Sequence, residues 1–395
     1  MKPILRTFVT SFVAASLTCV LATTRVLAAD VQLMPLVADV LWAPKPVLGS
    51  DEQYHLVYEL RLANPTPLAI SLEKVEILDD TGNISLELDK DKISKHFAIG
   101  GRRGAEATSL SVGQFGVLFV HVPVKANHNL PTTLAHRVSG LLVQPSPPHK
   151  SFTITVGETK VADAINMVLG PPLLGKGYIA GDGCCDSIRH VRALLPLNGR
   201  FALAQRFAID WEQVDAGKRL VNGDLKKVES YNIFGKEVIA VANGTVVATR
   251  NDLPEQIPGS LPDGLPIDQA DGNFVVLDIG NGAFALFAHM QPGSVRVVAG
   301  AKVKRGDVLG KVGNTGNTSA PHLHFHVMDG PSPLLSNGIP YTIDQFTVTD
   351  VDTAGTVDFD GGEATGSPLS LMTQAHRPPL QRVLPTDLTV VEFSK

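Results

Sequence analysis

The chain has 395 residues, of which 44% are hydrophobic and 18% are charged, and its formal net charge is −5. This length suits two domains of ordinary size, and the apolar fraction excludes a chain that is disordered by composition. The small negative charge gives no basic surface for nucleic acid. With 36 glycines, 27 prolines and many short runs rich in valine and threonine, the sequence favours an all-β fold.

Residues 1–29 have the pattern of a secretory signal peptide. Lys2 and Arg6 precede an uncharged apolar segment, and small residues follow at Ala28 and Ala29. Because the apolar run is shorter than the ~20 residues that a membrane span needs, we expect cleavage and not a retained anchor. The pattern predicts an exported chain, periplasmic or extracellular, with no transmembrane anchor after cleavage.

Residues 30–155 carry short apolar runs separated by turns. The runs at 56–62 and 117–122 are the clearest, and strands at such spacing predict a β-sandwich-like accessory domain. We find no catalytic constellation there, so a spacer or docking role is expected. The proline-rich stretch 145–148 breaks regular structure near its end, and residues 156–183 are expected to form a linker.

Residues 184–346 repeat a strand, turn, strand pattern, which predicts a compact antiparallel β domain. Its long loop at 254–271, rich in proline, glycine and aspartate, is of the kind that rims a cleft. The tail 347–395 is acidic and glycine-rich at first. Its apolar run Leu388–Phe393 is expected to add an edge strand.

Cys184 and Cys185 are adjacent in this second domain. Neighbouring Cα atoms lie about 3.8 Å apart across a trans peptide, which is shorter than the usual disulfide separation. Three interpretations stay open: a strained redox-labile pair, two buried thiols, or soft metal ligands.

Three histidines, His322, His324 and His326, alternate with apolar residues in the segment 319–328. On a β-strand successive side chains point to opposite faces, so the imidazoles would share one face while the apolar residues enter a core. Three of the twelve histidines of the chain lie within these five positions. The row therefore predicts a metal site more than a polar strand face that happens to carry histidine.

Five segments, taken in chain order, have a combined pattern: 235–244, Gly272–Asn273, Phe287–Met290, 306–313 and Pro321–Phe325. With this pattern the chain resembles the lysostaphin-like (LytM-type) zinc endopeptidases over roughly residues 185–345. The resemblance implies an antiparallel β fold of the duplicated hybrid motif type, one bound Zn²⁺, and cleavage of peptide cross-bridges in bacterial peptidoglycan.

The resemblance assigns roles to four residues of this chain. Asp210 and His324 match zinc ligands, and His289 and His322 match the pair that orients or deprotonates the attacking water and steadies the charged intermediate. These residue types suit the chemistry, since zinc takes imidazole nitrogen and carboxylate oxygen, and an imidazole titrates in the range needed to move a proton.

The sequence departs from the family at the remaining ligand, where Arg206 replaces a histidine four residues before Asp210. A guanidinium has no lone pair to offer, so Arg206 cannot bind zinc. An ion pair between Arg206 and Asp210 would leave a metal-free, inactive site. Two histidines are alternatives for the third ligand. His326 is equally explained as a polar residue on the strand face, and His190 as an ordinary surface histidine.

The sequence has three alternative functional interpretations. A degenerate, non-catalytic module that binds peptidoglycan or regulates a separate wall hydrolase fits the loss of the ligand at Arg206. A lipoyl or biotinyl carrier would leave the histidine row without a purpose. A cysteine or serine hydrolase has no nucleophile-elbow spacing here. Zinc content separates the metallopeptidase from the binding module.

Overall fold

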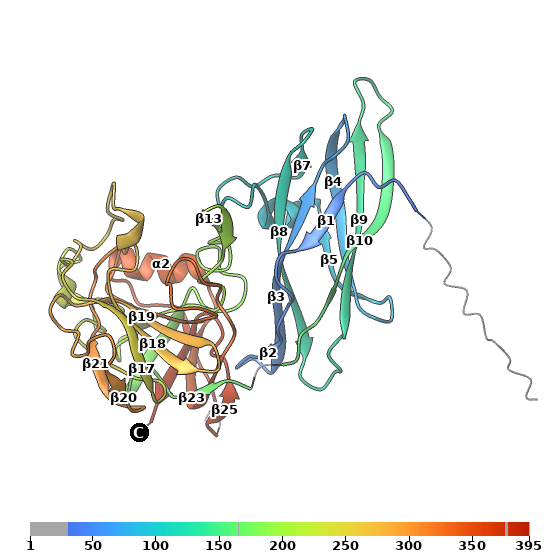
Figure 1. The fold of residues 1–395 in the computed structure, drawn as a ribbon. Coiled ribbons are helices and arrows are strands. Elements are labelled where there is room, and N and C mark those ends of the chain that lie inside the picture. Colours follow the sequence, from blue (N-terminus) through green and yellow to red (C-terminus); the bar gives the residue numbers. More distant parts are fainter. Residues whose placement is uncertain (1–30, 165, 376–377, 395) are drawn as a thin grey trace, which may run out of the picture. The chain divides into compact units, whose positions relative to one another are not determined.

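The computed structural model describes residues 31–164, 166–375 and 378–394, and Pro35–Lys395 form one compact unit. The predicted signal peptide lies outside the described residues. The regular secondary structure of the described residues is almost wholly β-strand, so the all-β prediction is confirmed (Figure 1). Within the described ranges no helix has the length and apolar character needed to cross a bilayer.

The N-terminal part contains two five-stranded antiparallel sheets. One has the order β1-β3-β8-β6 with β2 beside β3, and the other has the order β10-β9-β4-β5 with β7 beside β4. The bounds of the first are Val37–Val40 (β1), Val47–Leu48 (β2), Gln53–Ala63 (β3), Phe97–Ile99 (β6) and Phe115–Lys125 (β8). Those of the second are Ala69–Leu78 (β4), Ile84–Asp89 (β5), Ser109–Leu110 (β7), Thr133–Val143 (β9) and Lys150–Lys160 (β10), and the helix α1 is Lys90–His96.

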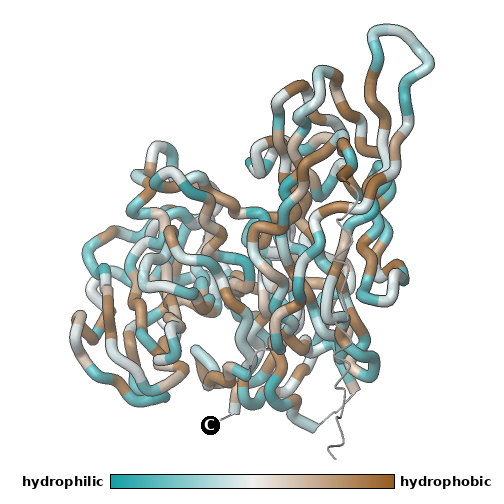
Figure 2. The backbone as a smooth tube through the Cα atoms, turned by 45° about the vertical axis from the view of Figure 1, so that its right-hand side comes forward, coloured by the Kyte–Doolittle hydropathy of each residue, from teal (hydrophilic) through white to brown (hydrophobic). Residues whose placement is uncertain are grey.

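Strand β3 is buried on both faces from His55 to Leu60, so its apolar residues alternate only partly with polar ones. Its even-numbered residues, such as Leu56 and Leu60, pack in the sandwich core with side chains of β4 and β9. Its odd-numbered residues face the other way, where Val57 joins the core of the C-terminal half. Figure 2 shows the brown, hydrophobic stretches running along such strands.

The C-terminal half is organised by a larger sheet with the order β11-β23-β26-β12-β15-β22-β19-β18-β17-β20, to which β24 and β25 add beside β23. Its strands are Val168–Leu169 (β11), Gly175–Gly181 (β12), Ile209–Gln213 (β15), Gly244–Arg250 (β17), Asn273–Gly280 (β18), Ala283–Met290 (β19), Lys302–Val303 (β20), Leu323–Met328 (β22), Thr342–Asp352 (β23), Leu371–Thr373 (β24), Leu380–Val383 (β25) and Thr389–Phe393 (β26). Two short pairs stand beside it, Leu195–Leu197 (β13) with Arg200–Ala202 (β14), and Glu237–Ile239 (β16) with Val308–Lys311 (β21). The helices are Val228–Ser230 (η1), Ile267–Gln269 (η2) and Thr356–Thr365 (α2).

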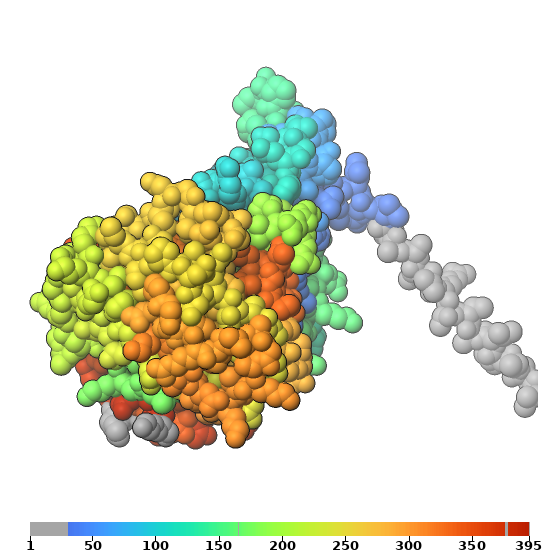
Figure 3. Space-filling view, turned by 60° about the vertical axis from the view of Figure 1, so that its left-hand side comes forward, coloured from blue at the N-terminus to red at the C-terminus, as the bar shows by residue number. Residues whose placement is uncertain are grey.

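The C-terminal tail is built into this sheet. Strand β26 lies between β12 and β23, so the expected edge strand is an interior strand. The reason is that it is apolar on both faces: Val391 and Phe393 enter the main core, while Val390 packs with Phe359 of α2. Figure 3 shows the red and orange-red surface of the tail beside the yellow and orange surface of residues 230–340.

Candidate metal centre and cleft

Three neighbouring strands, β15, β22 and β19, position the centre of the site. Asp210 on β15 lies directly opposite His324 on β22, and His324 lies opposite Ala288, the residue before His289. Directly opposed residues in an antiparallel pair share one face of the sheet. As a result, Nδ1 of His324 lies 2.7 Å from Oδ1 of Asp210, while Leu323, on the other face, enters the core.

His190 completes this group from a loop. The residue is only 5% exposed, so the surface-histidine interpretation is wrong. Nδ1 of His190 donates to the carbonyl oxygen of Asp182 at 2.8 Å, which directs Nε2 toward the sheet, 3.2 Å from Oδ2 of Asp210. Donor atoms of His190, Asp210 and His324 all lie within 4.8 Å of one another.

His326 lies on the same face of β22 but on the other side of His324. Its Nδ1 is 2.8 Å from Nε2 of His324, the nitrogen that faces away from Asp210. This contact fixes the ring of His324 with Nδ1 directed at the carboxylate, and a hydrogen-bond partner on the outer nitrogen of a histidine orients that ring for metal binding. The structure thus does not bring His326 to Asp210.

His289 and His322 face each other beside this group, with ring centroids 4.6 Å apart. In each ring Nδ1 donates to a backbone carbonyl: that of Thr315 for His289 at 2.7 Å, and that of Ala320 for His322 at 2.8 Å. Each ring therefore keeps Nε2 as its free nitrogen, and Nε2 of His322 lies 3.4 Å from Oδ1 of Asp210. His289 holds this place in left-handed backbone geometry, φ 59°, an uncommon conformation that tends to occur at functional sites.

The charges of the site favour a cation next to Asp210. Burial opposes the charge of His190, but Asp210 and Asp182 outweigh it and raise the pKa of His190 to about 9. Burial also opposes the charge of Asp210, yet His190 and His322 hold the pKa of that carboxyl well below its usual value. The ionised carboxylate therefore has protonated His190 as its partner, and a metal ion bound at this point would displace that proton.

The rings of His324, His289 and His326 are neutral near pH 7. Burial lowers the pKa of His324, and it lowers the pKa of His289 and His326 well below the usual histidine value. A neutral imidazole keeps a lone pair on one nitrogen, which is the form that binds metal or accepts a proton.

Arg206 takes no part in this centre. Its Nε and Nη2 donate to Oε1 and Oε2 of Glu59 at 2.9 and 2.8 Å, and its Nη1 donates to the carbonyl of Gly338. The guanidinium also lies 5.1 Å over the ring of Trp42. The ion pair with Asp210 considered from the sequence is therefore replaced by a pair with Glu59 on β3.

A cleft with a volume of about 700 Å³ opens over the histidines. Helix α2 lines it with Phe359, Asp360 and Glu363, and Glu363 accepts from the hydroxyl of Ser319 at 3.2 Å. Glu212, two residues after Asp210, also lines it. Sequence analysis missed the contribution of α2, because no local pattern shows that the tail returns to this face.

The residues present fit a zinc ion. Two imidazole nitrogens and one carboxylate oxygen converge, which is a donor set that zinc takes in catalytic sites while a further position stays open for water. Both imidazoles are oriented from behind, His190 by Asp182 and His324 by His326.

Comparison with known proteins finds a family match over part of the C-terminal half. Residues 229–335 match Peptidase family M23, so the predicted resemblance to lysostaphin-like zinc peptidases is confirmed for this region. The match includes His289, His322, His324 and His326. It begins after Asp210, His190 and Arg206, so these three residues lie outside it.

Two curated relatives are similar over parts of the chain. Peptidoglycan DD-endopeptidase ShyA of Vibrio cholerae serotype O1 is 32% identical over 149 residues, 36% of this chain and 28% of that protein. Endolysin 2638A of Staphylococcus phage 2638A is 32% identical over 80 residues, 20% of this chain and 16% of that protein. The chain thus spans less than a third of the length of either relative.

Among solved structures, the catalytic domain of lysostaphin from Staphylococcus simulans is 21% identical with a TM-score of 0.24, covering 41% of this chain and 88% of that one. A zinc-containing peptidase from Vibrio cholerae is 14% identical with a TM-score of 0.24, covering 73% of this chain and 83% of that one.

Proposed function

We propose that this chain, which carries a peptidase family M23 region, is an exported zinc metalloendopeptidase that cleaves peptide bonds in peptidoglycan cross-bridges. The observation that carries the proposal is the convergence of His190, Asp210 and His324 on one point of the cleft. A purely structural groove has no need of a half-buried carboxylate beside two buried imidazoles that are each oriented by a further contact.

In this proposal Nε2 of His190, the carboxylate of Asp210 and Nδ1 of His324 hold the zinc ion. Zinc in such a site brings the pKa of a bound water toward about 7 and polarises a carbonyl group. Arg206, although it stands at the position of a family ligand, serves the packing of the fold through Glu59.

His289 and His322 would handle the proton and the developing charge. Because their Nδ1 atoms are committed to backbone carbonyls, the free Nε2 atoms are the ones available to a reacting group. One ring accepts the proton of the attacking water, and the other donates to the oxyanion or the leaving amine. Burial lowers the pKa of His289 and keeps its ring neutral, so its Nε2 carries a lone pair.

The substrate class rests on the relatives. ShyA is named as a peptidoglycan DD-endopeptidase, and the region it shares with this chain covers 149 residues. A cleft of about 700 Å³ is of a size to hold several residues of an extended peptide. Peptidoglycan lies outside the cytoplasmic membrane, which agrees with the export expected from residues 1–29.

The test is to purify the chain, measure its zinc by mass spectrometry, and analyse by chromatography the fragments it releases from isolated peptidoglycan. We expect about one zinc per chain and newly freed peptide ends. His324→Ala should lose both zinc and product, whereas His128→Ala, at an exposed position in the N-terminal part, should keep both. Unchanged hydrolysis by His324→Ala would refute the assignment. Binding of peptidoglycan without zinc or cleavage would favour the non-catalytic module instead.

A further inference from the structure

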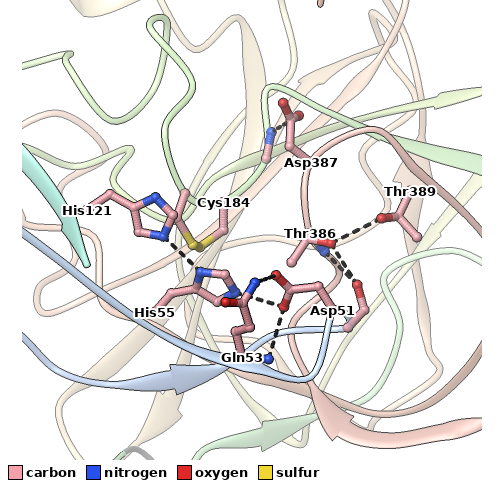
Figure 4. Close-up of a disulfide and its surroundings, with 11 residues drawn as sticks. Asp51, Gln53, His55, His121, Cys184, Thr386, Asp387 and Thr389 are labelled. Carbon is pink, nitrogen blue, oxygen red and sulfur yellow. Dashed lines mark hydrogen bonds and ion pairs between the residues drawn. A yellow bond between two sulfur atoms is a disulfide. The ribbon is translucent and has the colours of Figure 1, made fainter. Parts of the chain in front are cut away.

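A second group of potential metal ligands lies outside the residues that line the cleft. Cys184 and Cys185, in the loop that follows β12, form a disulfide. The two side chains are 3% and 5% exposed, and the carbonyl of Cys184 accepts from the backbone N–H of Asp387 at 3.0 Å. Figure 4 shows the rings of His55 and His121 next to the sulfur atoms.

The two histidines come from adjacent strands of the N-terminal sheet. In the pairing of β3 with β8, His121 lies opposite Val57, so His55 is its diagonal neighbour on the same face. Their rings stack with centroids 5.1 Å apart, and Nδ1 of His55 lies 2.9 Å from Nε2 of His121. The other nitrogen of His55 is 3.0 Å from Oδ1 of Asp51, which orients that ring.

Donor atoms of His55, His121 and Cys185 all lie within 4.8 Å of one another. Burial lowers the pKa of His121 to about 4, so this imidazole is neutral near pH 7 and has a lone pair to offer. One component is missing while the disulfide is intact, because a thiolate, and not a disulfide sulfur, is the form of cysteine that binds metal.

We propose that reduction of the Cys184–Cys185 disulfide turns this group into a binding site for a divalent cation of intermediate softness such as zinc, held by the sulfur of Cys185 and one nitrogen each of His55 and His121. The reductant is a dithiol, which gives two electrons and two protons to the disulfide and itself becomes a disulfide. Binding of the cation then displaces the proton of the Cys185 thiol.

Imidazole and thiolate together are a ligand set that zinc takes in proteins. The carboxylate of Asp51 contacts Nε2 of His55. A carboxylate in this position commonly orients a histidine that binds a metal through its other nitrogen. This site shares no ligand with the cleft, so the proposal of a metal site here does not depend on the proposed peptidase activity.

The test uses the full chain with Cys19→Ser, to leave only two cysteines, and with Asp210→Asn and His324→Ala, to remove the proposed cleft site. Cobalt(II) is the probe, because thiolate ligation adds a charge-transfer band to its spectrum. Two further variants form a matched pair, since both lack the disulfide: Cys184→Ser keeps the thiol of Cys185, and Cys185→Ser removes it.

We expect the Cys184→Ser chain to bind one cobalt(II) with a thiolate band without any reductant, and the Cys185→Ser chain to show no band. The chain with both cysteines should show the band only after treatment with a phosphine reductant, and His55→Ala with His121→Ala should abolish it. The proposal is overturned if both serine variants give equal bands, if the histidine variant keeps the band, or if the folded chain resists reduction. Circular dichroism shows whether each variant is folded. If a serine variant does not fold, the presence or absence of the thiolate band in the reduced chain with both cysteines decides the test.

Discussion

Arg206 is bound by both carboxylate oxygens of Glu59, a residue 147 positions earlier in the chain. The two side chains are 7% and 0% exposed, so this is a buried pair. Glu59 lies on the face of β3 that points away from the sandwich core, and Arg206 lies four residues before Asp210. The residue that the sequence resemblance places at a ligand position thus ties the N-terminal sheet to the segment that leads into β15.

Glu59→Gln is expected to destabilise the chain by about 3–5 kcal/mol, because it leaves the buried guanidinium of Arg206 without a charged partner. Urea unfolding followed by circular dichroism measures the loss. The matched control is Asp39→Asn, which breaks the half-exposed pair of Asp39 with Arg61 and should cost at most about 1 kcal/mol. Equal, small losses in both variants would show that the buried pair is not a major support.

His190→Ala is expected to lose stoichiometric zinc as fully as His324→Ala does. The reason is that two protein ligands are left in either variant, where catalytic zinc sites have three. Metal analysis after dialysis gives the result. His136→Ala is the control, because His136 is also buried but lies in the N-terminal part, bonded to Tyr58. Full zinc content in the His190→Ala chain would show that His190 is not a zinc ligand and that another residue is the third ligand.

The sequence predicted the strand β22 and its two faces from local alternation alone. Leu323, Phe325 and Val327 enter the core, and the three histidines lie on the opposite face. Strand periodicity sufficed because the pattern and the geometry have the same period of two residues. Asp210 was found through the resemblance, and the register of β15 with β22 sets it opposite His324.

The rest depends on contacts between distant segments, which no local pattern encodes. His190 is twenty residues from Asp210 and reaches it from a loop held by Asp182. The partner of Arg206 is on another sheet, and α2 comes to the cleft from the tail. The strand β3 gave one usable signal: an apolar run interrupted by Glu59 on a strand that is buried on both faces predicts a buried partner for that charge.

His326→Ala is expected to lower zinc affinity by about 10–100-fold while zinc still binds at saturation. Nε2 of His324 would lose its contact with Nδ1 of His326, so the ring would no longer be held with Nδ1 toward Asp210. Competition with a chelator of known affinity measures the change. Loss of all zinc even at saturating metal would instead make His326 a ligand.

His322→Ala is expected to keep zinc and lose hydrolysis by about 10²–10⁴-fold, because His322 handles a proton in the proposed mechanism and is not a ligand. Zinc content and the rate of product release are measured on the same sample. A variant that loses zinc and activity together would place His322 in the metal site instead.

Glu255→Gln is expected to change how stability depends on pH. Oε2 of Glu255 accepts from the backbone N–H of Asn314 at 2.5 Å, while Oε1 is buried with no hydrogen-bond partner among the described residues. Burial raises the pKa of this carboxyl to about 7 from an ordinary value of 4.5. The folded chain therefore holds this proton up to a higher pH than the unfolded chain does. The contribution of Glu255 to stability is greatest below about pH 4.5, declines as the pH rises to about 7, and is constant above that.

Glutamine has no proton to lose in this range, so the variant lacks the decline. The stability of Glu255→Gln relative to the parent chain should rise between about pH 4.5 and about pH 7 and then level off. Urea unfolding of both chains at several pH values across this range gives the difference. Glu229→Gln is the control, because Glu229 adds only a weaker repulsion that also raises the pKa of Glu255. A difference that stays flat with pH would mean that the carboxyl of Glu255 ionises equally easily in the folded and unfolded chains, and that its burial is relieved by solvent.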